Sequence, residues 1–206
     1  MALEGTHLRL ALDVKEKYQV SDLSKYLSGT IYPDSRYITA IDRNLTHPED
    51  FMDDAFFQED DFKKGWFVHL LCDKIQYNVT KQKFPNILAN EDKFEVWIDH
   101  SALKILQDIE DVKKFNIIEC LTALDYIENP NGEDPEKLRE YNRMFQKMYA
   151  DPAKVDIEIC CNMWKDLGVN SDYIDKIKKK AEEYGDNPEI TSLILGVYEE
   201  MLIRVK

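Results

Sequence analysis

Three of the four histidines in this 206-residue chain lie within its first 69 residues, close in sequence to aspartates. His69 and Asp73 are four residues apart, so on a helix both side chains lie on one face, about 5–6 Å apart at Cβ. Asp34 follows Pro33, which stiffens the turn that carries it. Imidazole and carboxylate groups together suit a borderline-soft divalent ion. We therefore predict a metal site formed by His7, Asp34, His47, His69 and Asp73.

The order of these residues resembles the zinc-dependent phospholipase C family, whose all-helical fold is shared with single-strand-specific zinc nucleases. The resemblance covers about residues 5–78, a little over a third of the chain. It consists of an early histidine, a Gly-x-x-x-Pro-Asp turn, a Thr-His pair and a Gly-x-x-x-His-x-x-x-Asp helix. In this sequence these are His7, Gly29 through Asp34, Thr46-His47, and Gly65 through His69 to Asp73.

The resemblance implies a metal-dependent hydrolase, a phosphoesterase for a phosphodiester or phospholipid-like substrate. Its zinc ions would polarise the phosphodiester and supply a metal-bound hydroxide as the nucleophile. The five residues would be the ligands; Asp73 would bridge ions and Asp34 would also orient the attacking water, which makes these two the expected catalytic residues. Arg36 and Arg43, in the same loop region, could hold phosphate oxygens of the substrate, although surface arginines are common.

The family pattern continues with a further histidine and then His-x-x-x-Glu, whereas the residue four beyond His100 is Lys104. We therefore expect a reduced site with one or two ions, of zinc or another divalent metal. His100 is a possible extra ligand from the next helix. The alternative interpretation of His100 is a residue on the helix surface.

Two other functions fit the same residues. A noncatalytic protein of this fold would keep the metal for structure or act as a helical interaction module, with residues 134–206 as a docking surface or homodimer face. An HD-like phosphohydrolase would also be all-helical, but its motif needs adjacent His-Asp, and here Asp99-His100 has the reverse order. A helical His-x-x-x-Asp pair also occurs as a core histidine bonded to a carboxylate, so the metal prediction depends on all five residues.

The composition indicates a globular and acidic protein. Hydrophobic residues make up 44% and charged residues 33%, and the net charge is 27 − 40 = −13. Such acidity disfavours nucleic acid, but divalent cations in a pocket would reverse the local sign for a small-molecule or lipid phosphoester. The four cysteines have no CxxC spacing, and neither a secretory signal nor an apolar window of roughly 18 residues occurs. We expect buried free thiols, no transmembrane segment and a cytoplasmic location.

Hydrophobic periodicity and helix breakers predict the elements that position these residues. We expect an all-α fold, a multi-helix bundle of the zinc-dependent phospholipase C type with additional C-terminal helices. The expected helices span about 3–18, 21–27, 61–80, 91–112, 117–127, 134–149, 151–167, 171–185 and 188–204, with a long functional loop over 30–60. Ser21 would cap the second helix and Gly29 would end it. Asp60 or Asp61 would cap the helix over 61–80, and Asp134-Pro135 would open the helix over 134–149. Residues 1–206 would form one domain, with a metal-site core over 1–128 and residues 134–206 packed on it.

Overall fold

The computed structural model describes residues 3–52 and 55–205, and these residues form helices and connecting loops with no strand among them. The all-α prediction is confirmed for this part of the chain. In chain order the elements are α1 (Glu4–Val14), α2 (Leu23–Ile31), η1 (Tyr32–Ser35), α3 (Arg36–Thr39), α4 (Arg43–Thr46), η2 (Ala55–Gln58), α5 (Asp61–Lys83), α6 (Lys93–Asp111), α7 (Ile117–Ala123), α8 (Pro135–Met148), η3 (Pro152–Lys154), α9 (Ile157–Asp166), α10 (Ser171–Gly185), α11 (Pro188–Leu195) and α12 (Val197–Val205). In these ranges no helix combines the length and apolar character needed to cross a membrane.

Helices α2 and α5 cross at a distance that two glycines allow. A β-carbon on Gly29 would lie 1.9 Å from the carbonyl oxygen of Phe62, and one on Gly65 would lie 1.9 Å from that of Tyr26. Any larger residue at either position would therefore force the two helices apart. The prediction that Gly29 ends a helix is wrong, because this glycine lies inside α2 and permits its contact with α5.

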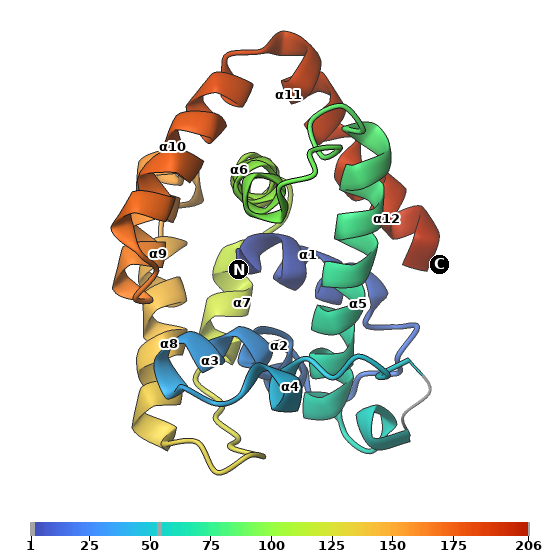
Figure 1. Cartoon of the computed structure of the whole chain (residues 1–206). Coiled ribbons are helices and arrows are strands. Elements are labelled where there is room, and N and C mark those ends of the chain that lie inside the picture. Colours follow the sequence, from blue (N-terminus) through green and yellow to red (C-terminus); the bar gives the residue numbers. More distant parts are fainter. Residues whose placement is uncertain (1–2, 53–54, 206) are drawn as a thin grey trace.

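Helix α6 lies near the middle of the molecule and is seen almost end-on in Figure 1. It contacts α1, α5, α9, α10, α11 and α12. Buried side chains such as Ile98, Ala102 and Ile105 line its length. The helix begins after Asp92, whose side chain accepts a hydrogen bond from the backbone N–H of Phe94 at 2.8 Å. Helix α6 is thus the element against which both halves of the chain pack.

The C-terminal helices arch over α6 from one side to the other (Figure 1). Helix α10 packs against α6, α12 packs against α5 and α1, and α8 packs against η1 and α3. Two hydroxyls from this part of the chain hold α1. Tyr198 donates to Asp13 Oδ2 at 2.6 Å, and Tyr141 donates to Glu4 Oε1 at 2.7 Å. The position of α1 therefore depends on residues far from it in sequence.

The first half of the chain follows the predicted pattern, but α1 and α7 each end four residues before the predicted end, at Val14 and Ala123, and α2 has a different cap. Ser21 is not the N-cap of α2, because its hydroxyl donates to Asp61 Oδ2 at 2.7 Å. Asp22 is the cap instead, and it accepts from the backbone N–H of Lys25 at 3.1 Å. The predicted irregular segment 30–60 contains only η1, α3, α4 and η2 after α2, with residues 53–54 outside the described part. The capping of α5 by Asp60 is confirmed.

Two predicted C-terminal helices are divided in the structure. Pro152 opens only the short helix η3, and the longer α9 begins after Asp156, which accepts from the backbone N–H of Ile159 at 2.8 Å. The predicted helix over 188–204 is interrupted at Gly196, between α11 and α12, where glycine's low helix propensity favours a break. The predicted start of α8 at Asp134-Pro135 is confirmed. The four cysteines are free and buried, as predicted.

Candidate metal centre

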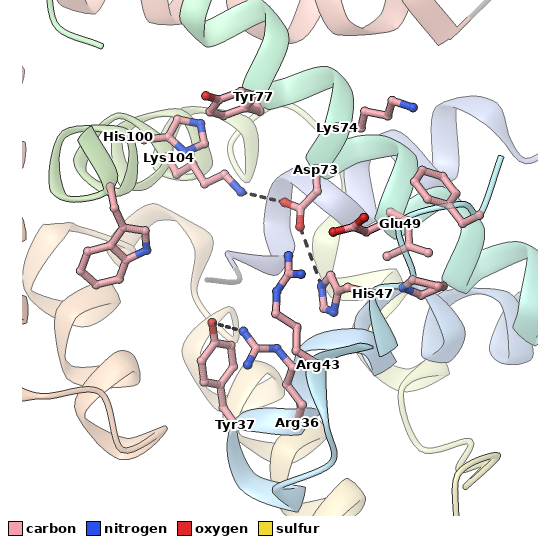
Figure 2. A pocket seen from close by; sticks show the side chains of 14 residues that line it. Arg36, Tyr37, Arg43, His47, Glu49, Asp73, Lys74, Tyr77, His100 and Lys104 are labelled. Atoms are coloured by element: carbon pink, nitrogen blue, oxygen red, sulfur yellow. Dashed lines mark hydrogen bonds and ion pairs between the residues drawn. The ribbon is translucent and has the colours of Figure 1, made fainter. Parts of the chain in front are cut away.

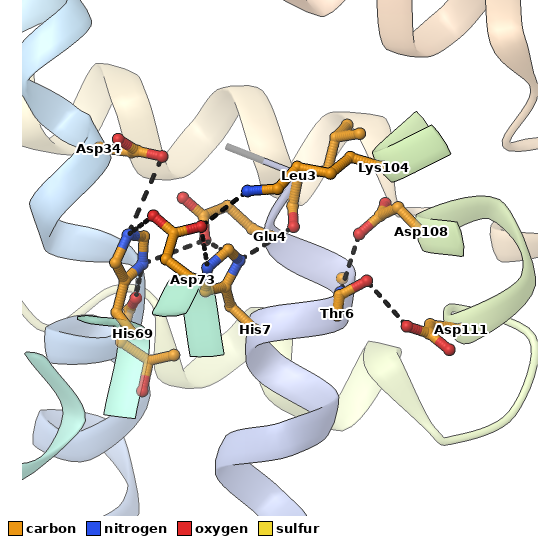
Figure 3. Close-up of polar contacts among 12 residues, drawn as sticks. Leu3, Glu4, Thr6, His7, Asp34, His69, Asp73, Lys104, Asp108 and Asp111 are labelled. Carbon is orange, nitrogen blue, oxygen red and sulfur yellow. Dashed lines mark hydrogen bonds and ion pairs between the residues drawn. The ribbon is translucent and has the colours of Figure 1, made fainter. Parts of the chain in front are cut away.

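The five residues predicted to bind metal lie together, although they come from four segments of the chain. These are His7 in α1, Asp34 in η1, His47 directly after α4, and His69 and Asp73 in α5. Figure 3 shows the side chains of His69 and His7 directed toward the Asp73 carboxylate. His7, Asp34 and His69 are almost completely buried, whereas the side chain of Asp73 is 27% exposed. The cluster is therefore enclosed on one side and open at Asp73.

The imidazoles of His7 and His69 are oriented by backbone carbonyls behind them. His7 Nδ1 lies 3.1 Å from the carbonyl oxygen of Leu3, and His69 Nδ1 lies 2.8 Å from that of Thr30. A carbonyl oxygen can only accept, so each Nδ1 carries the hydrogen and a neutral ring has its lone pair at Nε2. Both Nε2 atoms are buried without a hydrogen-bond partner. Metal-binding histidines characteristically have this arrangement.

His47 reaches the same tautomer through a side chain. Its Nδ1 lies 2.9 Å from Thr46 Oγ1, and that hydroxyl donates to the carbonyl oxygen of Arg43 at 3.3 Å. Because the hydroxyl hydrogen is used there, Oγ1 is left to accept from the Nδ1–H of His47. The lone pair of His47 is then at Nε2, which faces Asp34 and Asp73.

Asp34, His47 and His69 each offer a donor atom within 4.8 Å of the other two, and Asp73 Oδ2 adjoins both histidines. His47 Nε2 is 3.5 Å from Asp34 Oδ1 and 3.9 Å from Asp73 Oδ2. His69 Nε2 is 3.9 Å from Asp34 Oδ2 and 3.8 Å from Asp73 Oδ2. Zinc bonds of about 2.0–2.1 Å would give ligand separations of roughly 3.3–3.4 Å, whereas hydrogen bonds would be shorter than the observed distances. The atoms thus converge on one space without bonding to each other.

A second group of donors adjoins the first and includes Glu4, which the sequence analysis missed. Glu4 is fully buried, and its Oε2 lies 3.7 Å from His7 Nδ1 and 4.0 Å from His69 Nδ1. Tyr141 donates to Oε1, while Oε2 has no hydrogen-bond partner. Burial raises the pKa of this carboxyl to about 8. His7 Nε2 is also 3.6 Å from Asp73 Oδ1. The sequence signal for Glu4 is its i, i+3 spacing to His7.

Burial and neighbouring charges give several of these groups the protonation states of metal ligands. Burial lowers the pKa of His47 to about 4, and burial together with His7 lowers the pKa of His69 well below its usual value. Burial alone would raise the pKa of Asp73, but Lys104 and the adjoining histidines hold it well below its usual value. At neutral pH His47 and His69 are therefore neutral imidazoles beside an ionised carboxylate, as metal binding requires. Burial alone would lower the pKa of His7, but Cys72, Asp73 and Glu4 hold it well above its usual value.

Helix α1 is held by side chains of α6 and α8 in place of a cap of its own. Its N-cap residue makes no side-chain hydrogen bond. The backbone N–H of Thr6 donates to Asp108 Oδ1 and its hydroxyl donates to Asp111 Oδ2, each at 2.8 Å (Figure 3). The backbone N–H of Gly5 donates to the hydroxyl of Tyr149 at 3.0 Å. Acidic groups near the N-terminus of a helix stabilise it. This network therefore fixes the position of α1, which carries the potential metal ligands Glu4 and His7.

A cleft of about 610 Å³ opens beside the cluster. His47 and Asp73 are among its lining residues, so the cluster reaches the cleft (Figure 2). Its cationic lining residues besides histidine are Arg36, Arg43, Lys74 and Lys104. The acidic lining residues are Glu49 and Asp73. In a chain with a net charge of −13, this local excess of positive charge favours an anionic ligand.

The two arginines predicted to hold substrate both line this cleft. Arg43 is exposed and extends from α4 into the cleft (Figure 2). The guanidinium of Arg36 lies over the ring of Tyr37, 4.0 Å from its centroid, and Nη2 donates to the Tyr37 hydroxyl at 2.6 Å. Arg36 Nε is 3.7 Å from Asp34 Oδ1 and has no hydrogen-bond partner. One donor of this arginine therefore remains unused next to the cluster.

Two residues of α6 complete the cleft. His100 lines it but belongs to neither group of potential ligands among the described residues, and its ring stands edge-on to that of Tyr77. Lys104, one turn further along, places Nζ 2.7 Å from Asp73 Oδ1. A role for Lys104 could not be predicted from the sequence, because its partner Asp73 lies on a different helix and no helical spacing links the two residues. This pair follows from the fold alone.

Comparison of the chain with known protein families, curated proteins and solved structures finds no match. The cluster and its cleft are therefore the features of the molecule that indicate a function.

Proposed function

We propose that this protein is a metal-dependent phosphoesterase that holds a zinc ion between Asp34, His47, His69 and Asp73. The proposal rests above all on two imidazole nitrogens that each lie 3.5–3.9 Å from an oxygen of both carboxylates, at the edge of a cationic cleft. Two imidazoles and two carboxylates form a donor set that zinc accepts in four-coordinate sites, and other divalent metals can also occupy it. His7 would border this ion on the side of Glu4.

The donor set fits a metal ion better than a hydrogen-bonded core cluster. In such a cluster each imidazole would donate to a carboxylate. Here the Nδ1–H of His69 donates to a backbone carbonyl, and Nε2 is buried without a partner. An unpartnered buried nitrogen costs about 1–3 kcal/mol, and an ion bound there would remove that cost.

The cleft supplies the other groups that phosphoester hydrolysis needs. A bound zinc ion would act as a Lewis acid on a phosphoryl oxygen and would lower the pKa of a water molecule toward 7. Asp34 and Asp73 would hold the ion with their negative charge, and Asp34 would also orient the attacking water. Arg36 and Arg43 would bind the remaining phosphoryl oxygens from the cleft side.

The substrate class follows from the order of the ligands and from the lining of the cleft. The order resembles that of zinc-dependent phospholipase C, which supports a fold of that type and a phosphodiester or phospholipid-like substrate. The aromatic residues Tyr37, Tyr77 and Trp97 line the same cleft as the arginines. They would give the organic part of such a substrate a surface to pack on.

Metal content is the decisive measurement. Wild-type protein, purified without chelator or affinity-tag metal, would be compared by elemental mass spectrometry with a His69→Ala/Asp73→Ala variant. His100→Ala is the matched control, since His100 lines the cleft outside both donor groups. We expect about one ion per chain in the wild type and the control and none in the double variant. Hydrolysis of bis(p-nitrophenyl) phosphate should likewise occur with the wild type and the control and be absent from the double variant.

Two outcomes would contradict this proposal in different ways. If no metal binds in stoichiometric amount, even after reconstitution, the cluster is not a metal site. If metal binds but no phosphodiester or phospholipid is hydrolysed, the protein is a noncatalytic metal-binding protein.

A further inference from the structure

Lys104 is an unusual neighbour for a set of potential metal ligands. It is only 9% exposed, yet its ammonium contacts the carboxylate of Asp73 at 2.7 Å. The two oxygens of that carboxylate face different groups. Oδ2 faces His47 and His69, while Oδ1 faces Lys104 and, at 3.6 Å, His7. A lysine at this point places a fixed positive charge on one side of a carboxylate whose other side faces the imidazoles.

We propose that the Lys104 ammonium takes the place of a second metal ion on Asp73. This inference rests on the proposed function and deepens it: the site would hold a single ion, and Lys104 would bind a phosphoryl oxygen of the substrate beside that ion. In two-metal phosphoesterases, two cations about 3.5–4 Å apart together stabilise the attacking and leaving oxygens. In this protein the Lys104 ammonium would be one of the two cations and a metal ion the other.

The local charges agree with a single ion. Two carboxylates, those of Asp34 and Asp73, face the imidazoles of His47 and His69, and one divalent ion between them would balance their two negative charges. A second ion beside His7 Nε2 would lie next to Asp73 Oδ1, where it would meet the positive charge of the Lys104 ammonium.

The position of Lys104 also lets it meet a substrate. Lys104 and Asp73 both line the cleft, together with Arg36 and Arg43 (Figure 2). Figure 2 shows the Lys104 side chain crossing from α6 toward Asp73 on α5. An ammonium has three donors, and the contact with Asp73 uses one of them. The others remain for an oxygen that enters from the cleft.

Lys104→Met tests this inference because methionine has a similar length but no charge. Lys104→Arg restores the charge, and Lys81→Met is the control. Lys81 is exposed on α5 outside the cleft, 5.9 Å from the ring centroid of Tyr77. Zinc per folded chain would be counted by native mass spectrometry. The affinity of the one-zinc form for inorganic phosphate would be measured by calorimetry, which requires no turnover.

We expect one zinc ion in the wild type and phosphate binding that is about 10–100-fold weaker in Lys104→Met, the usual effect of losing a hydrogen bond to a charged group. Lys104→Arg should bind phosphate within about fivefold of the wild type, and Lys81→Met within about threefold, as expected for an exposed charge. If Lys104→Met fails to fold, the ion count of the wild type and the phosphate affinity of Lys104→Arg still test the inference.

Two results would overturn the inference alone. One is two zinc ions bound to the wild type. The other is a single ion with unchanged phosphate affinity in Lys104→Met. Absence of any ion from the wild type would overturn the proposed function as well.

Discussion

The imidazole of His7 stacks on that of His69, with ring centroids 4.2 Å apart and planes inclined by 15°. Two positive charges in such close contact inside the protein would repel each other strongly. Burial and the neighbouring His7 lower the pKa of His69 well below its usual value. His69 is therefore the neutral ring of the pair, with a lone pair that a metal ion can use without displacing a proton.

This stacked pair predicts unequal effects of two substitutions on zinc binding. His69→Ala should raise the dissociation constant for zinc by more than about 100-fold, because it removes a ligand, whereas His7→Ala should raise it by about tenfold, the lower end of the range for residues that support ligands. Competition with a chromophoric zinc chelator would measure both constants. Equal loss of zinc in the two variants would mean that the ion lies in the Glu4 and His7 group.

The hydroxyl that orients His47 gives a second prediction. Thr46→Val keeps the shape of the side chain but removes the acceptor of the His47 Nδ1–H bond. We expect the affinity for zinc to fall by about 10–100-fold. Thr39→Val is the control, since the hydroxyl of Thr39 donates only to a carbonyl of its own helix, that of Ser35. An equal loss in both variants would show that the effect comes from general destabilisation.

Helix starts could be predicted from the sequence where a polar side chain caps the helix that follows it. Asp60 and Asp134 cap α5 and α8 as the sequence indicates. The prediction that Gly29 ends a helix is wrong, because this glycine lies against the backbone carbonyl of Phe62, 33 residues away. That contact exists only when α2 crosses α5. Sequence position alone gives no sign of it.

The site shows the same division between local and tertiary information. Five potential ligands could be predicted, because histidines are few and their spacing is distinctive; that they bind metal stays a prediction. Glu4 was missed because a carboxylate near the start of a helix is ordinarily exposed. Here it is fully buried, and Tyr141 of α8 donates a hydrogen bond to it. Lys104 was missed because its partner Asp73 lies on another helix.

The arginines of the cleft predict an effect on substrate binding. Arg43→Met should raise the KM for a phosphodiester by about tenfold with little change in kcat, because it removes one charged donor to the phosphate. Arg139→Met is a suitable control, since Arg139 is exposed on α8 and pairs with Glu136 outside the cleft. Steady-state kinetics on zinc-loaded protein would measure both. A fall in kcat alone for Arg43→Met would assign this arginine to the chemical step.

The carboxylates that hold α1 predict a dependence of stability on pH. Burial raises the pKa of Asp108 to about 6 and that of Asp111 to about 7, whereas both would titrate near 3.9 in the unfolded chain. The folded state therefore binds more protons between these values. Protonation of these two carboxyls therefore stabilises the folded state fully below about pH 4, and this stabilisation is lost as the pH rises through about 6–7.

Asp111→Asn isolates this effect because asparagine cannot titrate. From about pH 5 to pH 8, the unfolding free energy of the wild type should fall relative to that of the variant by about 2–3 kcal/mol. Urea unfolding in the presence of EDTA, followed by circular dichroism, would measure the difference without contributions from bound metal. Parallel pH profiles would show that Asp111 is already ionised throughout this range in the folded protein.

The backbone contact between α2 and α5 limits how relatives of this protein can diverge. Gly65 lies one helical turn before His69, and Gly29 lies five residues before Asp34, so each glycine is followed closely by a potential ligand. Loss of either would separate the carbonyl of Thr30 from the ring of His69 that it orients. Distant descendants should therefore keep Gly-x4-Asp and Gly-x3-His after other sequence likeness has vanished. A search for these two short patterns in helical proteins would then detect kinship that whole-chain comparison misses.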